Sequence, residues 1–244
     1  MKIQILAFAA HPDDIELSCS GTLLLHHLKG YTTGIIDLTA GELGSRGSVE
    51  LRRQEAKAAA EILGISVREN LQLRDGFFQN NEDSVRKVIE AIRRYQPDII
   101  LANALRDRHP DHGRAAQLVR DACFYSGLVK IETQWEGMAQ TPWRPKRVFH
   151  YIQDTDLVPD FIVDISSTFE KKIESIQAYG SQFFNQSFEG PETYISNRQF
   201  IDSIEFRNRT LGKRIGVHYG EGFQSPDNPL GLSDFSGLVL PQMV

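Results

Sequence analysis

The sequence of 244 residues contains only two cysteines, no hydrophobic run of membrane-spanning length and no excess of positive charge. Cys19 and Cys123 lie in apolar-periodic stretches without a Cys-x-x-Cys partner, so neither a disulfide framework nor a cysteine-ligated zinc site is indicated. The apolar runs have the length of strands, well short of the ~20 residues that cross a bilayer. The formal net charge of −5 gives no broad basic field for nucleic acids or anionic membranes. We therefore expect neither as a partner.

We also expect neither a signal peptide nor a dinucleotide-binding site. The chain begins Met-Lys-Ile-Gln-Ile-Leu and enters a strand-like run at once, which leaves no room for a signal peptide. We expect both cysteines to be buried free thiols, and together with this start of the chain they predict a cytoplasmic protein. Gly41, Gly44 and Gly47 do not form Gly-x-Gly-x-x-Gly, and the turn before His11 has no glycine. Dinucleotide binding is therefore not expected.

The composition is that of an ordinary globular protein, with 41% hydrophobic and 24% charged residues. No linker or low-complexity tract divides the chain, so we predict one domain over residues 1–244. Residues 216–244 are rich in Gly, Pro, Asp and Ser and are expected to form a loop-rich extension packed on the body or on a neighbouring subunit. This extension carries five apolar residues that need a surface to cover: Phe223, Phe235, Leu238, Val239 and Leu240. We therefore expect a homo-oligomer.

Strand-like and helical periodicities alternate along the chain, which predicts an α/β fold. Strands are expected at residues 3–9, 33–39, 71–73, 98–102, 148–152 and 161–165. Helices are expected at residues 17–28, 49–63, 82–95, 113–124, 169–179 and 199–215. This pattern predicts a Rossmann-like, doubly wound, mostly parallel sheet with helices on both faces. The usual strand order 3-2-1-4-5 places the first strand beside the fourth, and ligands bind there at the carboxyl ends of the strands.

Two related motifs follow these two strands. The run Ile3–Ala9 ends in His11-Pro12-Asp13-Asp14, and the run Asp98–Ala102 is followed by His109-Pro110-Asp111-His112. Packing does not require adjacent aspartates after a core strand, and buried carboxylates are costly unless they are paired or bind a metal. Because the first and fourth strands are expected to be neighbours, the two motifs should meet at one site.

The residue types in these motifs suit a divalent metal. Imidazoles and a carboxylate are zinc ligands, and a site with three protein ligands leaves an open position for catalysis. His11 and Asp14 are three residues apart and can share one side of a turn, whereas Asp13 points elsewhere. A carboxylate beside a zinc-activated water can accept its proton. Iron(II), manganese or cobalt suits the same ligands. The alternative interpretation is that the aspartates cap helices and the histidines are incidental.

With these motifs the chain resembles the PIG-L/LmbE-like zinc-dependent N-acetylglucosaminyl deacetylases, and within them the bacillithiol-biosynthesis branch that deacetylates N-acetylglucosaminyl malate. The resemblance covers nearly the whole chain. Besides the two motifs, it rests on Gly41-Glu42-Leu43-Gly44, Arg52, Glu55, Ala59-Ala60, Leu63-Gly64, Ser181-Gln182-Phe183, Pro191-Glu192-Thr193 and Tyr219-Gly220-Glu221-Gly222-Phe223. Tyr194 departs from the proline that relatives often carry. Relatives form homo-oligomers, often hexamers.

The resemblance implies a role for each motif residue. One zinc ion per subunit would be held by His11, Asp14 and His112, with Fe²⁺ among the other possible metals. Asp13 would be the general base, and His109 would stabilise the oxyanion or protonate the leaving amine. Spacing alone leaves open which of His109 and His112 is the ligand. Asp111 would either orient a histidine or cap its turn.

The same resemblance predicts the substrate contacts. Glu42, Arg52 and Asp75 match positions that face the sugar, and Arg52 would pair with a malate carboxylate. The alternative for Arg52 is a solvated helix residue paired with Glu55. Arg108 is a further candidate for contact with an anion.

We therefore predict a zinc hydrolase that removes the N-acetyl group from an N-acetylglucosamine conjugate, most simply N-acetylglucosaminyl malate. The first alternative is a metal-dependent phosphoesterase, although such enzymes usually need a second metal ion and bridging carboxylates. The second is a non-catalytic module that binds a sugar or a metal; the intact base candidate Asp13 argues against it.

Overall fold

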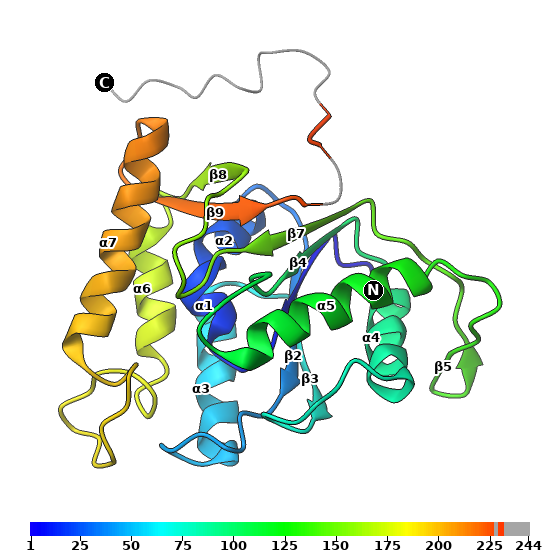
Figure 1. The fold of residues 1–244 in the computed structure, drawn as a ribbon, viewed down its shortest axis with the longest axis horizontal. Coiled ribbons are helices and arrows are strands. Elements are labelled where there is room, and N and C mark those ends of the chain that lie inside the picture. The colour runs from blue at the N-terminus through cyan, green and yellow to red at the C-terminus, as the bar shows by residue number, and fades with distance from the viewer. Residues whose placement is uncertain (227–228, 232–244) are drawn as a thin grey trace.

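The computed structural model describes residues 1–226 and 229–231. Its central sheet contains seven strands in the order β3-β2-β1-β4-β7-β9-β8 (Figure 1). These strands are β1 (Ile5–Ala9), β2 (Thr33–Thr39), β3 (Val67–Leu73), β4 (Ile99–Ala102), β7 (Arg147–Tyr151), β8 (Phe161–Asp164) and β9 (Gly220–Gln224). A separate hairpin pairs β5 (Gln134–Trp135) with β6 (Met138–Ala139). Within this sheet, the neighbouring strands β3, β2, β1, β4 and β7 are parallel to one another. Strand β9 runs antiparallel to both of its neighbours, β7 and β8. The predicted mostly parallel α/β sheet is confirmed.

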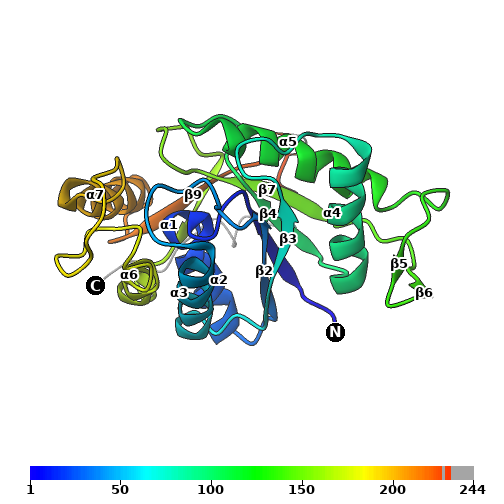
Figure 2. The same ribbon diagram turned by 90° about the horizontal axis from the view of Figure 1, so that it is seen from below.

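Helices cover both faces of this sheet (Figure 2). They are α1 (Asp14–Ser18), α2 (Ser20–Leu28), α3 (Val49–Ile62), α4 (Glu82–Tyr95), α5 (Pro110–Tyr125), α6 (Phe169–Gln177) and α7 (Arg198–Ile215). Alternate residues of β1 point to opposite faces, as the geometry of a strand requires. Leu6 and Phe8 pack in the core shared with α4 and α5, whereas Ile5 and Ala7 pack in the core shared with α1 and α2. None of the helices within the described part is long and apolar enough to cross a membrane.

The predicted neighbour relation between the first and fourth strands is confirmed. Ala7 of β1 pairs with Leu101 of β4 on one side and with Ile35 of β2 on the other. Both β1 and β4 are nearly fully buried and apolar, as expected for strands covered on two faces. The two His-Pro motifs, which follow the carboxyl ends of these strands, therefore lie side by side.

The predicted helix over residues 17–28 is confirmed except for a break at one residue. The structure has two helices, α1 and α2, which are separated at Cys19, where φ is −138°. Helix α1 begins at Asp14, the last residue of the first motif, so the preceding residues of the motif form the turn into the helix. The apolar spacing marked the buried face of α2 but carried no information about this break.

The loop expected from residue 216 onward is also wrong at its start, because β9 lies inside the sheet between β7 and β8. The sequence Gly-Glu-Gly-Phe-Gln has no strand-like alternation of apolar and polar residues. Its Glu221 is buried and forms an ion pair with Lys172 of α6. Phe223 is buried too, and its ring stacks on that of Phe161 with a centroid separation of 5.3 Å. It therefore needs no second subunit to cover it. Phe235, Leu238, Val239 and Leu240 lie outside the described residues.

Candidate metal and catalytic centre

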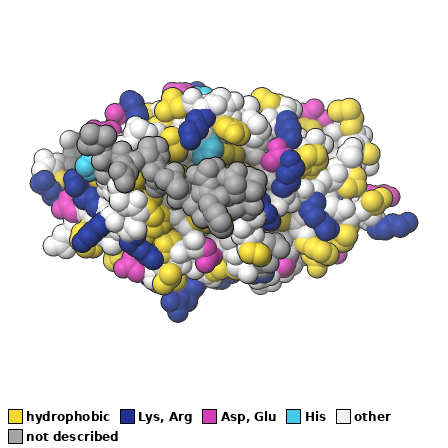
Figure 3. Space-filling view, turned by 90° about the horizontal axis from the view of Figure 1, so that it is seen from above, with side chains coloured by type: hydrophobic (Ala, Val, Ile, Leu, Met, Phe, Trp, Pro, Cys, Tyr) yellow, Lys and Arg dark blue, Asp and Glu magenta, His cyan; other side chains and the backbone are white. Residues whose placement is uncertain are grey.

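The two His-Pro motifs form one wall of a cavity of about 400 Å³ at the carboxyl ends of β1 and β4. Further lining comes from α7 and from the segment that precedes it, with Tyr194, Phe200 and Ile204. Helices α6 and α7 lie together at one end of the molecule, and the β5–β6 hairpin lies at the other (Figures 1 and 2). On the face shown in Figure 3, described basic and acidic side chains are interspersed, with no continuous basic surface. The volume of the cavity suits a small molecule.

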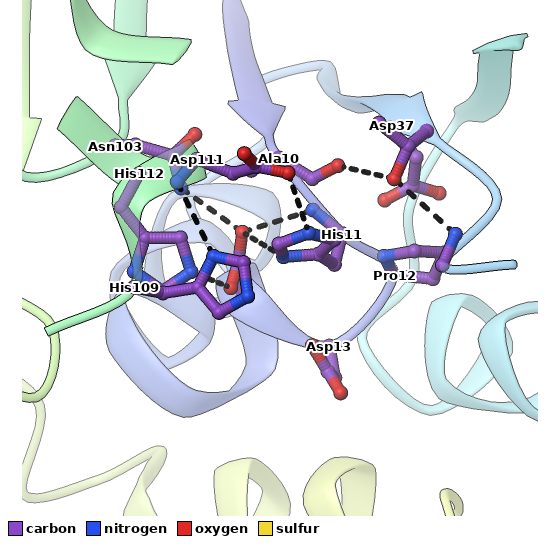
Figure 4. A network of polar contacts seen from close by, with 12 residues as sticks. Ala10, His11, Pro12, Asp13, Asp37, Asn103, His109, Asp111 and His112 are labelled. Carbon is purple, nitrogen blue, oxygen red and sulfur yellow. Dashed lines mark hydrogen bonds and ion pairs between the residues drawn. The ribbon is translucent and has the colours of Figure 1, made fainter. Parts of the chain in front are cut away.

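The first motif places two adjacent aspartates in different directions. Asp13 has a φ of 127°, a conformation that non-glycine residues rarely adopt and that costs of order 1–3 kcal/mol. Arg52 of α3 supports this turn, because its Nε donates to the Pro12 carbonyl at 3.1 Å and its guanidinium contacts the Asp13 carboxylate. Figure 4 shows the Asp13 side chain directed away from the histidine cluster.

Asp14 points the other way and joins the two motifs. Its Oδ2 accepts a hydrogen bond from the His11 backbone N–H at 3.0 Å, and its Oδ1 lies 3.1 Å from His112 Nε2. His11 Nδ1 lies 3.9 Å from Asp14 Oδ2. All three side chains are buried. The three residues expected to bind a metal are therefore brought together.

The second motif begins α5. His109 precedes the helix as its N-cap, Pro110 is its first residue, and His109 Nδ1 accepts a hydrogen bond from the Asp111 backbone N–H at 3.2 Å. The ring centroid of His109 lies 4.7 Å from that of His11 and 5.2 Å from that of His112 (Figure 4). Because Nδ1 accepts a hydrogen bond, neutral His109 carries its proton on Nε2.

Acidic side chains orient the buried imidazoles. His11 Nε2 lies 3.0 Å from Asp75 Oδ1 and 3.4 Å from Asp111 Oδ2, and His112 Nδ1 is hydrogen-bonded to Asp107. Of the two roles considered for Asp111, orientation of histidines is the one that this geometry supports. Such carboxylate–histidine pairs are typical of metal sites, where they set the tautomer and raise ligand basicity.

Burial and these carboxylates shift the pKa values of the metal-free centre. Burial lowers the pKa of His11 and His112, but hydrogen bonds and negative charge from the neighbouring aspartates outweigh it and raise them to about 10 and about 9. Burial raises the pKa of Asp13 to about 6 although Arg52 opposes the shift. The pKa of Asp14 is lowered because the charges of His112 and His11 outweigh its burial. Burial and the charges of the other two histidines lower the pKa of His109.

The residues fit a divalent metal ion by the chemistry of their donors. Ligand atoms of His11, His109 and His112 lie within 4.8 Å of one another, and so do those of His11, Asp75 and Asp111. Imidazole nitrogens with one carboxylate, as in His11, Asp14 and His112, form a donor set that zinc and other first-row metals favour. The structure therefore holds a possible metal site at the predicted place, with His109 close enough to be considered as a ligand too.

The predicted substrate contacts have different surroundings. Arg52 and Arg108 line the cavity, as does Asp75. Arg52 is buried against Asp13, so the alternative of a solvated pair with Glu55 is wrong; Glu55 instead accepts hydrogen bonds from Ser181. Glu42 lies beside the cavity, and its carboxylate accepts the Asp75 backbone N–H at 2.8 Å.

Three residues of the centre escaped the sequence analysis, namely Asn103, Asp107 and Gln153. Asn103 and Gln153 contact Asp14, and Asp107 contacts His112. Each lies just beyond the carboxyl end of a parallel strand, β4 or β7. Their position after a strand was the only sequence feature that could have indicated a place in the site. Single polar residues at strand ends are too common for this feature to identify them.

Comparisons with known proteins agree with this geometry. The family model described as PIG-L, GlcNAc-PI de-N-acetylase, matches residues 6–123, which include both motifs. The crystal structure of the conserved protein TT1542 from Thermus thermophilus superposes with a TM-score of 0.84 at 35% identity, covering 95% of this chain and 98% of that one.

Two curated relatives match most of the chain and differ in activity. The 4-oxalmesaconate hydratase of Pseudomonas putida is 29% identical, with 90% of this chain and 88% of the hydratase covered. The diacetylchitobiose deacetylase of Thermococcus kodakarensis is 27% identical, with 91% of this chain and 82% of that enzyme covered.

The malate-specific likeness is weaker. The probable N-acetyl-alpha-D-glucosaminyl L-malate deacetylase 2 of Bacillus anthracis is 24% identical, covering 73% of this chain and 81% of that protein. The comparisons therefore support the family, and the bacillithiol branch is one distant relative among several.

Proposed function

Because the chain belongs to the PIG-L family, we propose that it is a zinc-dependent hydrolase that removes the N-acetyl group from an N-acetylglucosamine conjugate. One observation carries this proposal. Asp13, backed by Arg52, and His109, with its proton on Nε2, line the same cavity as His11, Asp14 and His112. A base and a hydrogen-bond donor for an oxyanion thus lie beside a metal-binding set, as amide hydrolysis requires.

Each residue has a definite task in this reaction. His11, Asp14 and His112 would hold a divalent ion, which when bound would polarise the amide carbonyl as a Lewis acid and lower the pKa of water. Asp13 accepts the proton of the attacking water; its pKa of about 6 keeps it ionised at neutral pH and still basic enough to act. His109 is neutral at that pH, so its Nε2–H donates a hydrogen bond to the developing oxyanion, and the proton that Asp13 took from water passes to the departing glucosamine nitrogen. Acetate and a free amine are the products.

For the substrate we infer N-acetylglucosaminyl malate, the bacillithiol precursor, in the cytoplasm. Arg108 is the residue that supports an anionic aglycone. It lines the cavity, and it binds Asp154 through Nε rather than through its terminal nitrogens. Arg52 is less suited to this role because Asp13 already holds its guanidinium. The two cysteines are free and buried, which fits a reducing compartment.

Hydration of an unsaturated acid is the second candidate, because the hydratase relative covers most of the chain. Asp13, a metal and an anion-binding arginine would also serve addition of water to a double bond. The two reactions differ at the leaving group, since only deacetylation needs a proton for a departing amine. Release of acetate with a free amine is therefore the result that separates them.

Incubation of the zinc-loaded protein with a substrate panel tests the proposal. The panel contains N-acetylglucosaminyl malate, a neutral N-acetylglucosaminide, a phosphomonoester and an unsaturated dicarboxylic acid, and mass spectrometry measures the products. We expect acetate release from both glycosides, faster from the malate conjugate, and a larger KM for that conjugate in Arg108→Ala. Equal rates on the two glycosides would remove the argument for an anionic aglycone. Phosphate release or hydration without acetate would replace the proposed function, and no turnover of any compound would favour a binding module.

A further inference from the structure

Gln153 contacts two of the proposed metal ligands from a direction that neither motif supplies. Its side chain is buried, and it lies two residues beyond the end of β7. Its Oε1 accepts hydrogen bonds from Asn103 Nδ2 at 3.0 Å and from the Ala104 backbone N–H at 3.1 Å. Because a backbone N–H can only donate, the oxygen of the amide must face Ala104. The orientation of the amide is thereby fixed, and its nitrogen faces Asp14.

The Gln153 nitrogen lies between Asp14 and His112. Nε2 donates to Asp14 Oδ1 at 3.2 Å and lies 3.4 Å from His112 Nε2. The other oxygen, Asp14 Oδ2, already accepts from the His11 backbone N–H and, at 2.9 Å, from Asn103 Nδ2. Two donors therefore occupy Oδ2, and the carboxylate is held so that Oδ1 faces His112.

The backbone of Gln153 is anchored to the same helix that carries Asp14. Arg207 of α7 donates to the Gln153 carbonyl through Nη1 and to the Leu17 carbonyl of α1 through Nη2, the latter at 3.0 Å. Gln153 is thus fixed at its backbone, at its amide oxygen and at its amide nitrogen. An uncharged side chain held at so many points beside a metal-binding carboxylate is suited to orienting that carboxylate.

We propose that Gln153, supported by Asn103, is a positioning residue that makes Asp14 present the single oxygen Oδ1, alongside His112 Nε2, to the divalent ion. The proposal rests on the metal dependence of the proposed function but not on its substrate. Loss of the amide should free the Asp14 carboxylate to rotate and weaken the metal site. A carboxylate in place of the amide should add a negative oxygen donor beside Asp14 and change the coordination of the metal.

Full-length protein and two variants, Gln153→Met and Gln153→Glu, test this proposal. The control is Gln182→Met, because Gln182 also lines the cavity but bonds to Ser181 and to the Arg46 carbonyl instead. Zinc affinity is measured by competition with a chromophoric chelator, and coordination by the visible spectrum of the cobalt-loaded protein.

We expect Gln153→Met to bind zinc about 10–100-fold more weakly, the cost typical of losing a group that orients a metal ligand. Gln153→Glu should bind zinc at least as tightly as the unsubstituted protein but with an altered cobalt spectrum and a lower kcat. Gln182→Met should match the unsubstituted protein in zinc affinity and cobalt spectrum.

The proposal is overturned if Gln153→Met keeps the zinc affinity and cobalt spectrum of the unsubstituted protein. If Gln153→Met fails to fold, the test depends on Gln153→Glu, and a cobalt spectrum of Gln153→Glu equal to that of the unsubstituted protein rejects the positioning role. These readouts need no substrate. Altered metal binding in the Gln153 variants, without acetate release from any conjugate by the unsubstituted protein, would uphold the positioning role and reject the deacetylase function.

Discussion

At the scale of single residues, Asp13 and Asp14 show how environment separates two identical side chains. Asp13 faces Arg52 across a strained turn, and burial raises its pKa to about 6. Asp14 faces His112 and accepts the His11 backbone N–H, and its pKa is lowered because these interactions outweigh burial. One carboxylate is thus suited to accepting a proton and the other to remaining a ligand.

Asparagine substitutions should separate these two roles. Asp13→Asn should retain zinc and lose about 10²–10⁴-fold in kcat, because an amide cannot accept the proton of water. Asp14→Asn should instead bind zinc more weakly, and excess zinc should restore part of its activity. Elemental analysis of the purified variants and acetate release at increasing zinc measure both effects. Loss of zinc from Asp13→Asn and its retention by Asp14→Asn would reverse the assignment.

Metal binding should release protons at neutral pH. With pKa values of about 10 and about 9, His11 and His112 are protonated at pH 7 in the metal-free protein, whereas a metal binds neutral imidazole. The apparent zinc affinity should therefore rise with pH between about 6 and 8, by up to tenfold per unit for each histidine that loses a proton. Calorimetry in buffers of different ionisation enthalpy counts these protons.

Asp107→Asn provides the matched comparison for this proton count. The variant removes the carboxylate that is hydrogen-bonded to His112 Nδ1, so the pKa of His112 should fall and fewer protons should be released at pH 7. An affinity that does not change with pH in the unsubstituted protein would contradict the expectation.

At the scale of elements, strand β9 is joined to two helices by buried charges. Glu221 accepts hydrogen bonds from the Gly21 and Thr22 backbone N–H groups of α2 at 3.0 and 2.7 Å, and it pairs with Lys172 of α6 at 2.8 Å. The exposed fractions of the Lys172 and Glu221 side chains are 0% and 1%. A strand with two glycines and little apolar surface is thus held in the sheet by polar contacts.

Breaking this pair should destabilise the protein strongly. Lys172→Met leaves a buried carboxylate without its cation, and removal of one partner from a buried pair costs about 3–5 kcal/mol of unfolding free energy. The double variant Lys172→Met/Glu221→Gln removes both charges and should lose less than the single variant. Urea unfolding monitored by circular dichroism measures both. A single variant within about 1 kcal/mol of the unsubstituted protein would show that the pair contributes little.

At the scale of the whole molecule, we retain the expectation of a homo-oligomer. Several apolar side chains on the described surface are largely exposed, including Phe124 at 56%, Phe206 at 72% and Val129 at 77%. Exposed apolar groups of this size mark candidate contact surfaces when they lie together. Sedimentation velocity at micromolar concentration should give a multiple of the 27.6 kDa chain mass, with a hexamer among the expected forms. A species of the chain mass alone would refute the expectation.

The sequence by itself determined the order of the central strands and the meeting of the two motifs. His11 and His109 are 98 residues apart, yet apolar runs, proline positions and the handedness of crossovers were sufficient to bring them together. These features are local or follow from chain connectivity, so the sequence displays them directly. The position of helix α4 at Glu82–Tyr95 was predicted for the same reason, because its apolar residues recur with helical spacing.

Only the tertiary structure decided which polar groups face one another. Arg52 is bound to Asp13 rather than to Glu55, Gln153 contacts Asp14 from the segment after β7, and Glu221 is buried beside Lys172. Each of these contacts joins residues from different elements, and its energy depends on burial and orientation, which no spacing along the chain encodes. The sequence therefore named the residues to which we assign the proposed chemistry, and the packing of distant segments decided how each one is held.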